Sequence, residues 1–394
     1  MKRAVFSGVV LALTLASTAS CQPANAANPE RQRALALEQQ GKSAEAEAAW
    51  RAYLKTHGSS AEPYAHLGLL EARQEHYKEA IPLYRKALAL GPDLPSVRLN
   101  LGLALFKEGD LKGAIQAFEP LEKTLPGNQQ VTTLLGMAHY GLAEYAKAVP
   151  YLREAAAHNA QSLELRLALA HSCLWSKQNQ CVLDVYKEIL ALNPDSAEAD
   201  MLAGEALDEM KDNEGSTKMF RAAVQADPKE PNAHFGLGYL LWSQKKYKEA
   251  ASEFQAELAN DPDHVQARLY LGDTYIQLNA MDAALPLLEK AEQQNPALPL
   301  VHLDLGIVYS DLDRKEDALR ELLATEKITP DDVNVHWRLA RLYRTMGKTE
   351  EAKAEFEKAG KLNKAADDDL YKKIANGHPR PADPQAPEAA PPQP

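Results

Sequence analysis

The chain has 394 residues, of which 45% are hydrophobic and 25% are charged, with a formal net charge of −11 and a pI near 5.6. These proportions are those of an ordinary soluble globular protein. The acidic balance argues against a nucleic-acid-binding protein, which usually carries a basic surface. It does not by itself indicate a particular ligand.

Residues 1–26 are predicted to be a signal peptide. A basic start is followed by an apolar run over residues 4–16, which is too short to span a bilayer. Residues 24–26 (Ala-Asn-Ala) fit the A-x-A cleavage pattern, and residues 17–19 offer an earlier site. In a third alternative Cys21 becomes the acylated first residue of a lipoprotein. We therefore expect an exported protein, periplasmic or secreted, which is anchored to the outer membrane only if Cys21 is lipidated.

A 34-residue repeat fills residues 27–366. Seven glycines are spaced by 34 residues or a multiple of it, and alanine holds the other slots. The glycines are Gly68, Gly102, Gly136, Gly204, Gly238, Gly272 and Gly306, and the alanines are Ala34, Ala170 and Ala340. When each unit is numbered 1–34 from residue 27, ten units follow without insertion and this column is position 8. A fixed period of this length indicates one supersecondary unit repeated along the chain.

Other columns of the repeat explain why each unit should be a helical hairpin. Apolar residues follow helical spacing in two bursts, which predicts two amphipathic helices per unit. Position 20 is small in nine units and is Val182 in the remaining one. Small side chains at positions 8 and 20 let the two helices approach closely. Large apolar side chains at position 24, such as Trp50 and Phe118, are expected to fill the space between consecutive pairs. Proline at position 32 ends the second helix.

This pattern resembles the tetratricopeptide repeat (TPR) family, whose signature is small residues at positions 8 and 20, an aromatic near 24 and proline at 32. The resemblance implies an all-α, right-handed superhelical solenoid of about ten helix-turn-helix units. The first helix of each unit would line a concave groove that binds a peptide or protein partner. The resemblance also implies that the protein has no chemistry of its own.

Some residues depart from the pattern. Pro82, Pro150 and Pro286 at position 22, and Pro120 at position 26, fall inside second helices, where we expect local kinks because proline removes a helical hydrogen bond. Lys364 replaces the proline that should end the last unit. Residues 367–376 are predicted to add a short capping helix. Residues 377–394 are rich in proline and are predicted to be a disordered tail.

No catalytic, cofactor or metal motif stands out, so we expect neither an enzyme nor a cofactor. His234, His302 and His336 share position 4, but they lie in separate units, so packing or surface roles are expected rather than a metal site. Cys173 and Cys181 fall on opposite arms of one hairpin. They could form a disulfide in an oxidising compartment, or remain two thiols if the side chain at position 19 points away from its partner.

If first helices line the groove, positions 5, 9, 12 and 13 should face the partner. They supply an aromatic and apolar floor, an acidic notch and a basic end. The predicted groove residues are Leu103, Phe106, Met137, Tyr140, His171, Leu174, Trp175, Glu205, Asp208, Glu209, Phe235, Tyr239, Trp242, Trp337, Arg341 and Arg344. Aromatic residues and arginine dominate binding hot spots. The sequence thus predicts a non-enzymatic protein-interaction scaffold. The alternative is a lipoprotein-type assembly factor for pilus or polysaccharide export, and neither interpretation identifies the partner.

Overall fold

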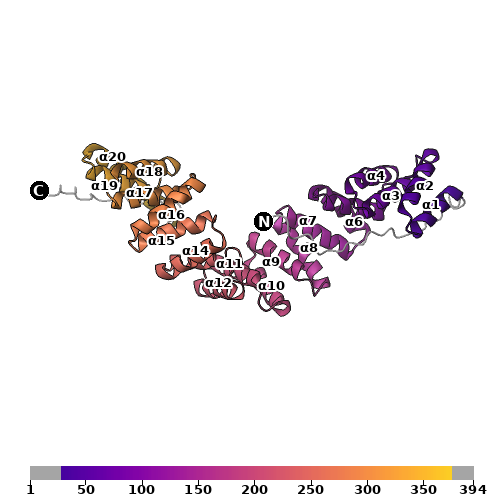
Figure 1. Cartoon of the computed structure of the whole chain (residues 1–394), viewed down its shortest axis with the longest axis horizontal. Coiled ribbons are helices and arrows are strands. Elements are labelled where there is room, and N and C mark those ends of the chain that lie inside the picture. Colours follow the sequence, from indigo (N-terminus) through magenta and orange to yellow (C-terminus); the bar gives the residue numbers. More distant parts are fainter. Residues whose placement is uncertain (1–27, 375–394) are drawn as a thin grey trace. The chain divides into compact units, whose positions relative to one another are not determined.

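Every regular element in the computed structural model is an α-helix over the described residues, 28–374, as the repeat pattern predicts (Figure 1). Side chains are described for residues 28–366. The predicted signal peptide, Cys21 and the proline-rich tail lie outside the described residues. The chain divides into two compact units, Met1–Ala226 and Asp227–Pro394. Each unit is described by itself below.

The first unit contains six helix pairs. Their helices are α1 (Pro29–Gln39), α2 (Ser43–Thr56), α3 (Ala61–Arg73), α4 (Tyr77–Leu90), α5 (Pro95–Lys107), α6 (Leu111–Thr124), α7 (Gln129–Gly141), α8 (Tyr145–His158), α9 (Leu163–Trp175), α10 (Asn179–Leu192), α11 (Ala197–Glu209) and α12 (Asn213–Ala226). The second unit contains the remaining four pairs. They are α13 (Ala233–Ser243), α14 (Tyr247–Asn260), α15 (Val265–Gln277), α16 (Met281–Gln294), α17 (Pro299–Asp311), α18 (Lys315–Ile328), α19 (Val333–Thr345) and α20 (Thr349–Ile374).

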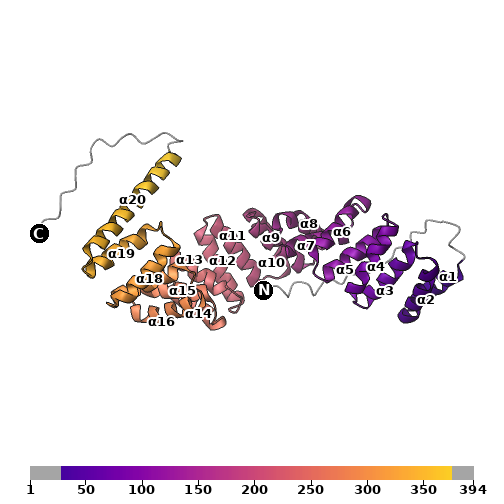
Figure 2. The same ribbon diagram turned by 90° about the horizontal axis from the view of Figure 1, so that it is seen from above.

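Odd-numbered helices are the first helices of the repeats, and even-numbered helices are the second. The two helices of each pair pack against each other, as the second view shows for each unit (Figure 2). First helices also contact the first helix of the next pair, for example α7 with α9 and α9 with α11, or α15 with α17 and α17 with α19. Within each unit the first helices therefore form a row. The TPR resemblance places the partner on this row.

Position 8 packs directly against position 24 of the same pair. A β-carbon added at Gly68 would lie 2.8 Å from the ring of Tyr84, and one at Gly204 would lie 2.8 Å from the ring of Phe220. The side chains of Tyr84 and Phe220 are 0% and 4% exposed. The expectation that position 24 fills the space between consecutive pairs is therefore incomplete. Its side chain also closes the crossing within its own pair, because glycine leaves the room.

The turn between the two helices of each pair has a residue in the left-handed region at position 15 in all ten repeats. Three of these residues are glycines, Gly41, Gly109 and Gly347, with φ between 72° and 82°. The others carry a β-carbon and have φ between 57° and 66°, namely Glu75, Ala143, Lys177, Lys211, Lys245, Asn279 and Asp313. This conformation costs a non-glycine residue about 1–2 kcal/mol. Packing of the two helices must therefore hold the turn in place.

Helix α13 starts differently from the other first helices. Its N-cap residue Asn232 is left-handed, with φ 68°, and makes no side-chain cap. Glu257 of α14 replaces the cap, because its carboxylate accepts hydrogen bonds from the backbone N–H groups of Asn232 and Phe235, both at 3.1 Å. A carboxylate is favourable at the positive end of a helix. This explains why a glutamate at position 27 is only 2% exposed.

The internal prolines do not interrupt their helices. Pro82, Pro120, Pro150 and Pro286 lie inside α4, α6, α8 and α16, each of which continues to the end of its repeat. The separate capping helix predicted at residues 367–376 is wrong. With Lys364 in place of the terminating proline, α20 runs without a break from Thr349 to Ile374. None of the helices described, α1 to α20, combines the length and apolarity that a membrane crossing requires.

Candidate functional site

The sixteen predicted groove residues all lie on first helices, but three of them are not accessible. Leu103, Met137 and Leu174 are 3%, 2% and 4% exposed. They belong to two hydrophobic clusters between neighbouring pairs, and Phe106 is half-buried against both of these clusters. Because first helices contact one another, apolar side chains at these positions fill the contact. The prediction that Leu103, Met137 and Leu174 face a partner is therefore wrong.

Three aromatic side chains are exposed on first helices, one in the first unit and two in the second. Trp175, Tyr239 and Trp337 are 49%, 37% and 45% exposed, and they lie on α9, α13 and α19. Among the described residues these are the only exposed aromatic side chains, and all three are predicted groove residues. Burying such side chains against a partner would release water from a large apolar area.

In the first unit, Trp175 belongs to a group of four rings that we call the first aromatic cluster: Tyr140, Tyr145, His171 and Trp175. The Trp175 ring centre lies 4.8 Å from that of His171, with which it stacks, and 4.6 Å from that of Tyr145. Tyr140 stacks toward Trp175 at 6.4 Å. Tyr145 comes from the start of the second helix α8, which the groove positions did not include. Burial raises the pKa of the Tyr140 hydroxyl to about 12, so it stays neutral and can donate a hydrogen bond.

Helix α11, which contacts α9, carries the acidic side chains Glu198, Glu205, Asp208 and Glu209. His171 Nε2 lies 2.8 Å from Glu198 Oε1, so this carboxylate is already paired. Glu205 is exposed, yet the surrounding protein raises its pKa above the ordinary value, and the carboxylate of Glu209 adds to this while His171 opposes it. The predicted acidic notch of Glu205, Asp208 and Glu209 is thus on α11, facing the first aromatic cluster with Glu205.

The second unit has its own group of rings on α13 and α15, which we call the second aromatic cluster: Phe235, Tyr239, Trp242 and Tyr270. Tyr239 stacks on Trp242 at 5.9 Å between ring centres, and Tyr270 meets both edge-on at 5.3 and 5.2 Å. Tyr270 was missed because it occupies position 6. The other cluster residue at the pair contact, Phe235, is half-buried against Phe254.

Carboxylates behind the second aromatic cluster are buried. Trp242 Nε1 donates a hydrogen bond to Asp273, which is 6% exposed. On the next first helix, Asp304 is 1% exposed and its Oδ2 has no partner among the described residues. Burial, reinforced by Asp273, raises the pKa of Asp304 well above its ordinary value, although Arg338 opposes this. Burial therefore disfavours the charged form of Asp304.

The predicted basic end lies on α19. Arg341 and Arg344 are exposed, and Trp337 meets Phe356 edge-on at 4.9 Å. Arg338, one position away from the predicted set, joins Arg341 in lining a hollow of about 390 Å³ between α17 and α19. Desolvation by the surrounding protein lowers the pKa of Arg338, and Arg341 contributes to this lowering. Asp311 and Asp313 also line the hollow, so its charge is mixed.

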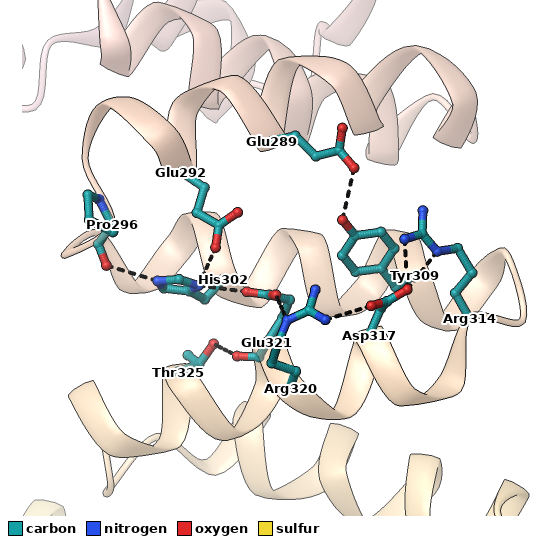
Figure 3. A network of polar contacts seen from close by, with 10 residues as sticks. All are labelled: Glu289, Glu292, Pro296, His302, Tyr309, Arg314, Asp317, Arg320, Glu321 and Thr325. Atoms are coloured by element: carbon teal, nitrogen blue, oxygen red, sulfur yellow. Dashed lines mark hydrogen bonds and ion pairs between the residues drawn. The ribbon is translucent and has the colours of Figure 1, made fainter.

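The three position-4 histidines join helices rather than face the groove. In Figure 3, His302 points with one nitrogen to Pro296 and with the other to Glu321 and Glu292. Nε2 lies 2.9 Å from the Pro296 carbonyl oxygen, and Nδ1 lies 2.8 Å from the Glu321 carboxylate. His336 repeats this with Pro330 at 2.8 Å and Glu355 at 2.6 Å. Both nitrogens must donate to make both bonds, so each ring is a protonated link between its own pair and the preceding turn.

These links bear on whether a metal could bind. The ligand atoms of Glu292, His302 and Glu321 lie within 4.8 Å of one another, and the equivalent residues Glu326, His336 and Glu355 do the same. A metal ion would have to displace the Nδ1 proton of the histidine. It would also compete with cations already on the carboxylates, since Arg320 Nε donates to Glu321 and Lys358 bridges Glu326 and Glu355. We assign both groups to ion pairing within the fold.

Cys173 and Cys181 form a disulfide between α9 and α10, with their Cα atoms 5.8 Å apart. Of the two alternatives that the sequence left open, the structure has the bonded one. Cys173 lies two residues after His171 of the first aromatic cluster, so the bond ties the helix that carries His171 and Trp175 to its partner helix.

The sequence matches family models over most of its length. One model described as tetratricopeptide repeat matches residues 31–95, 67–129, 183–231, 209–263 and 235–299, and two others with the same description match residues 279–336 and 333–365. The chain belongs to the TPR family. No curated protein matches the sequence. The matched segments leave residues 130–182 between them, which include the first aromatic cluster and the disulfide.

Solved structures of other TPR-type proteins resemble parts of this TPR chain. YrrB, described as a TPR protein with an unusual peptide-binding site, is 19% identical, covers 48% of this chain and 97% of its own, and has a TM-score of 0.41. MamA from Desulfovibrio magneticus RS-1 is 18% identical over 43% of this chain and 96% of its own, with a TM-score of 0.41. The Cut9–Hcn1 complex covers 88% and 89% at 12% identity, with a TM-score of 0.42. These likenesses are too distant to indicate what this chain binds.

Proposed function

We propose that this TPR protein is a non-enzymatic scaffold that binds an extended segment of a partner protein along its first helices. The observation that carries the proposal is the placement of the exposed aromatic side chains Trp175, Tyr239 and Trp337, all on first helices. Exposed aromatics with free polar groups beside them are typical anchors of binding hot spots. Each anchor could contribute roughly 1.5–3 kcal/mol when a partner covers it.

The polar groups around these anchors support the same proposal. Glu205 and Glu209 lie on α11, which contacts the helix that carries Trp175, and Arg341 and Arg344 lie on the helix that carries Trp337. Such groups give orientation and specificity to a partner, while the rings supply the apolar contact. Asp273 and Asp304 are the carboxylates of the second unit that lie behind the second aromatic cluster. Both are buried, so they are less accessible to a substrate. The family resemblance likewise favours binding over catalysis.

The proposal can be tested with the full-length protein and a displayed library of random peptides. Selected peptides would be titrated against the wild type and against Trp175→Ala, Tyr239→Ala and Trp337→Ala. We expect each peptide to lose roughly tenfold or more in affinity with at least one of these variants, because an apolar anchor is removed. Unchanged affinity for all three variants would contradict the proposal.

Matched controls exist on the second helices. Leu90 on α4 and Leu323 on α18 are 37% and 40% exposed, close to the exposure of Tyr239. The variants Leu90→Ala and Leu323→Ala should leave peptide affinity unchanged, because these residues lie off the row of first helices. Circular dichroism of every variant would show that the helices are retained. A loss with Leu323→Ala equal to that with Tyr239→Ala would argue for non-specific apolar binding.

We also propose that the protein is exported, as its first 26 residues predict. The disulfide between Cys173 and Cys181 is consistent with an oxidising compartment, where such bonds persist. The assembly-factor alternative additionally requires a lipid at Cys21, which lies outside the described residues. Mass spectrometry of the mature N-terminus distinguishes the two, since lipidation leaves Cys21 as the acylated first residue. A protein that retains Met1 at its N-terminus would contradict export by this segment.

A further inference from the structure

We propose that the first aromatic cluster, together with Glu205, binds a lysine or arginine side chain of the partner segment. This inference rests on the proposed function and specifies its chemistry at one place in the first unit. The cluster offers aromatic faces, and α11 offers negative charge. An organic cation with an apolar stem is the group that satisfies both.

The rings provide the first half of the site. Trp175, whose indole is the best side chain for attracting a cation to its face, is 49% exposed. His171 and Tyr145 hold it on two sides, with ring centres 4.8 and 4.6 Å away. Tyr140 lies 6.1 Å from Tyr145 and 6.4 Å from Trp175. An indole that is held by neighbouring rings and is still about half exposed can stack a guanidinium plane or an ammonium-bearing chain.

The carboxylates provide the second half. Glu198 is engaged by His171. In contrast, no hydrogen bond or ion pair within residues 28–366 engages Glu205 or Glu209. Burial raises the pKa of Glu205 and so disfavours its charged form, and the nearby His171 offsets this only in part. A ligand cation would supply the missing charge.

The chemistry of the site selects among cations. A metal ion would need several oxygen or nitrogen ligands converging on one point, whereas three of the four cluster rings offer faces and hydroxyls. A side chain of lysine or arginine brings an apolar stem for the rings and a charged head for Glu205. The net charge of the protein, −11, also favours approach of a basic segment.

The second aromatic cluster provides a comparison within the chain. Its nearest carboxylate, Asp273, is 6% exposed and already accepts hydrogen bonds from Trp242 and Gln277. Tyr239 is therefore an exposed ring in a cluster whose hydrogen-bonded carboxylate is already engaged. If the inference is right, preference for a cation belongs to Trp175 and not to Trp242.

The experiment follows the indole N–H signals of the four tryptophans of the full-length protein by NMR. Trp175→Phe assigns the signal of interest. The probes are N-acetyl-arginine methylamide and N-acetyl-citrulline methylamide, which have nearly the same shape but differ in charge. We expect the Trp175 signal to shift saturably with the arginine amide, with an affinity at least about threefold higher than for the citrulline amide. The Trp242 signal should respond to both probes alike.

Charge variants then locate the preference. Glu205→Gln should reduce the arginine affinity to the citrulline level. Glu214→Gln, which removes one charge from an exposed position on the second helix α12, should leave the preference intact. Equal affinities for the two probes in the wild type would overturn the inference, as would an unchanged preference in Glu205→Gln or the absence of any Trp175 shift at the solubility limit. The proposed function is tested separately, because peptides can depend on Trp175 without preferring a charge.

Discussion

The ring of Phe118 lies against the backbone of Gly102, so that a β-carbon at Gly102 would come within 2.2 Å of the ring. Phe118 is 0% exposed, so its ring is enclosed by other side chains and cannot turn out into solvent. We therefore predict that Gly102→Ala destabilises the first unit. Overpacking costs about 1–3 kcal/mol, and the helix propensity of alanine returns about 1 kcal/mol of this. Urea unfolding followed by circular dichroism measures the difference.

Gly360→Ala is the matched control for Gly102→Ala. Gly360 lies inside α20, and a β-carbon there would meet nothing within 4 Å. This variant should gain up to about 1 kcal/mol, because only helix propensity changes. If both substitutions stabilise the protein, the close approach of Phe118 to Gly102 is not part of the folded state.

Ala143 tests the left-handed position 15. Its φ of 59° is unfavourable for a residue with a β-carbon. We predict that Ala143→Gly raises the free energy of unfolding by roughly 0.5–1 kcal/mol, because glycine adopts this conformation without steric cost. Ala146→Gly, at an exposed position inside α8, should lower it by a similar amount. Thermal melts of the two variants should shift in opposite directions; a shift in the same direction would remove the argument from backbone strain.

The repeat columns predicted the helix pairs but not the geometry of the turns. Position 15 holds glycine in three repeats and residues such as Lys177 or Asp313 in the others, so no side-chain pattern marks a conformation that the helix packing imposes. The groove prediction was wrong for Leu103, Met137 and Leu174 for a similar reason. Periodicity places Leu174 and Trp175 next to each other on one helix, but their exposures of 4% and 49% depend on how α9 sits against its neighbours. Burial at a helix contact depends on tertiary packing. The family pattern gives only the burial that is usual at each repeat position.

The groove positions of the repeat also did not predict the aromatic residues that complete the two clusters. Tyr145 belongs to a second helix and Tyr270 to position 6, yet each completes a cluster around a predicted residue. The useful signal was the gathering of aromatic residues in adjacent repeats. The position-4 histidines are similar, because their shared column was visible, whereas their acceptors Glu321 and the Pro296 carbonyl come from other parts of the repeat.

The disulfide gives a prediction for the first unit. Closing the loop between Cys173 and Cys181 should stabilise the folded state by about 2.5 kcal/mol, because the bond restricts the unfolded chain. Reduction with dithiothreitol should lower the urea midpoint of the wild type. The double variant Cys173→Ala/Cys181→Ala should have the lower midpoint already and should not respond to the reductant. A wild-type midpoint that is the same with and without reductant would show that the bond is absent or makes no net contribution.

His302 gives a prediction for pH dependence in the second unit. Burial lowers its pKa, but the hydrogen bonds to Glu321 and the Pro296 carbonyl outweigh burial, so that the net pKa is raised above its ordinary value. A raised pKa in the folded state means that the stabilisation is fully present below about pH 6.5 and is lost as the pH rises through the folded-state pKa. We predict that His302→Gln costs roughly 1–3 kcal/mol at pH 5.5, as expected for hydrogen bonds to a charged group. The cost should be smaller at pH 8.5.

A double-mutant cycle with Glu321→Gln separates this link from other titrating groups nearby. Glu292 also faces His302, and its own pKa is raised, chiefly by burial, so the wild type alone would not isolate the histidine. Because His302 and Glu321 act through one contact of 2.8 Å, the double variant should be less destabilised at pH 5.5 than the sum of the two single variants. At pH 8.5 the coupling energy between them should be smaller, because a neutral imidazole has no charge with which to attract the Glu321 carboxylate. Coupling that is equal at both pH values would mean that the ring is not protonated in this contact, and the two-sided link between Pro296 and Glu321 would then have to be replaced by a single hydrogen bond.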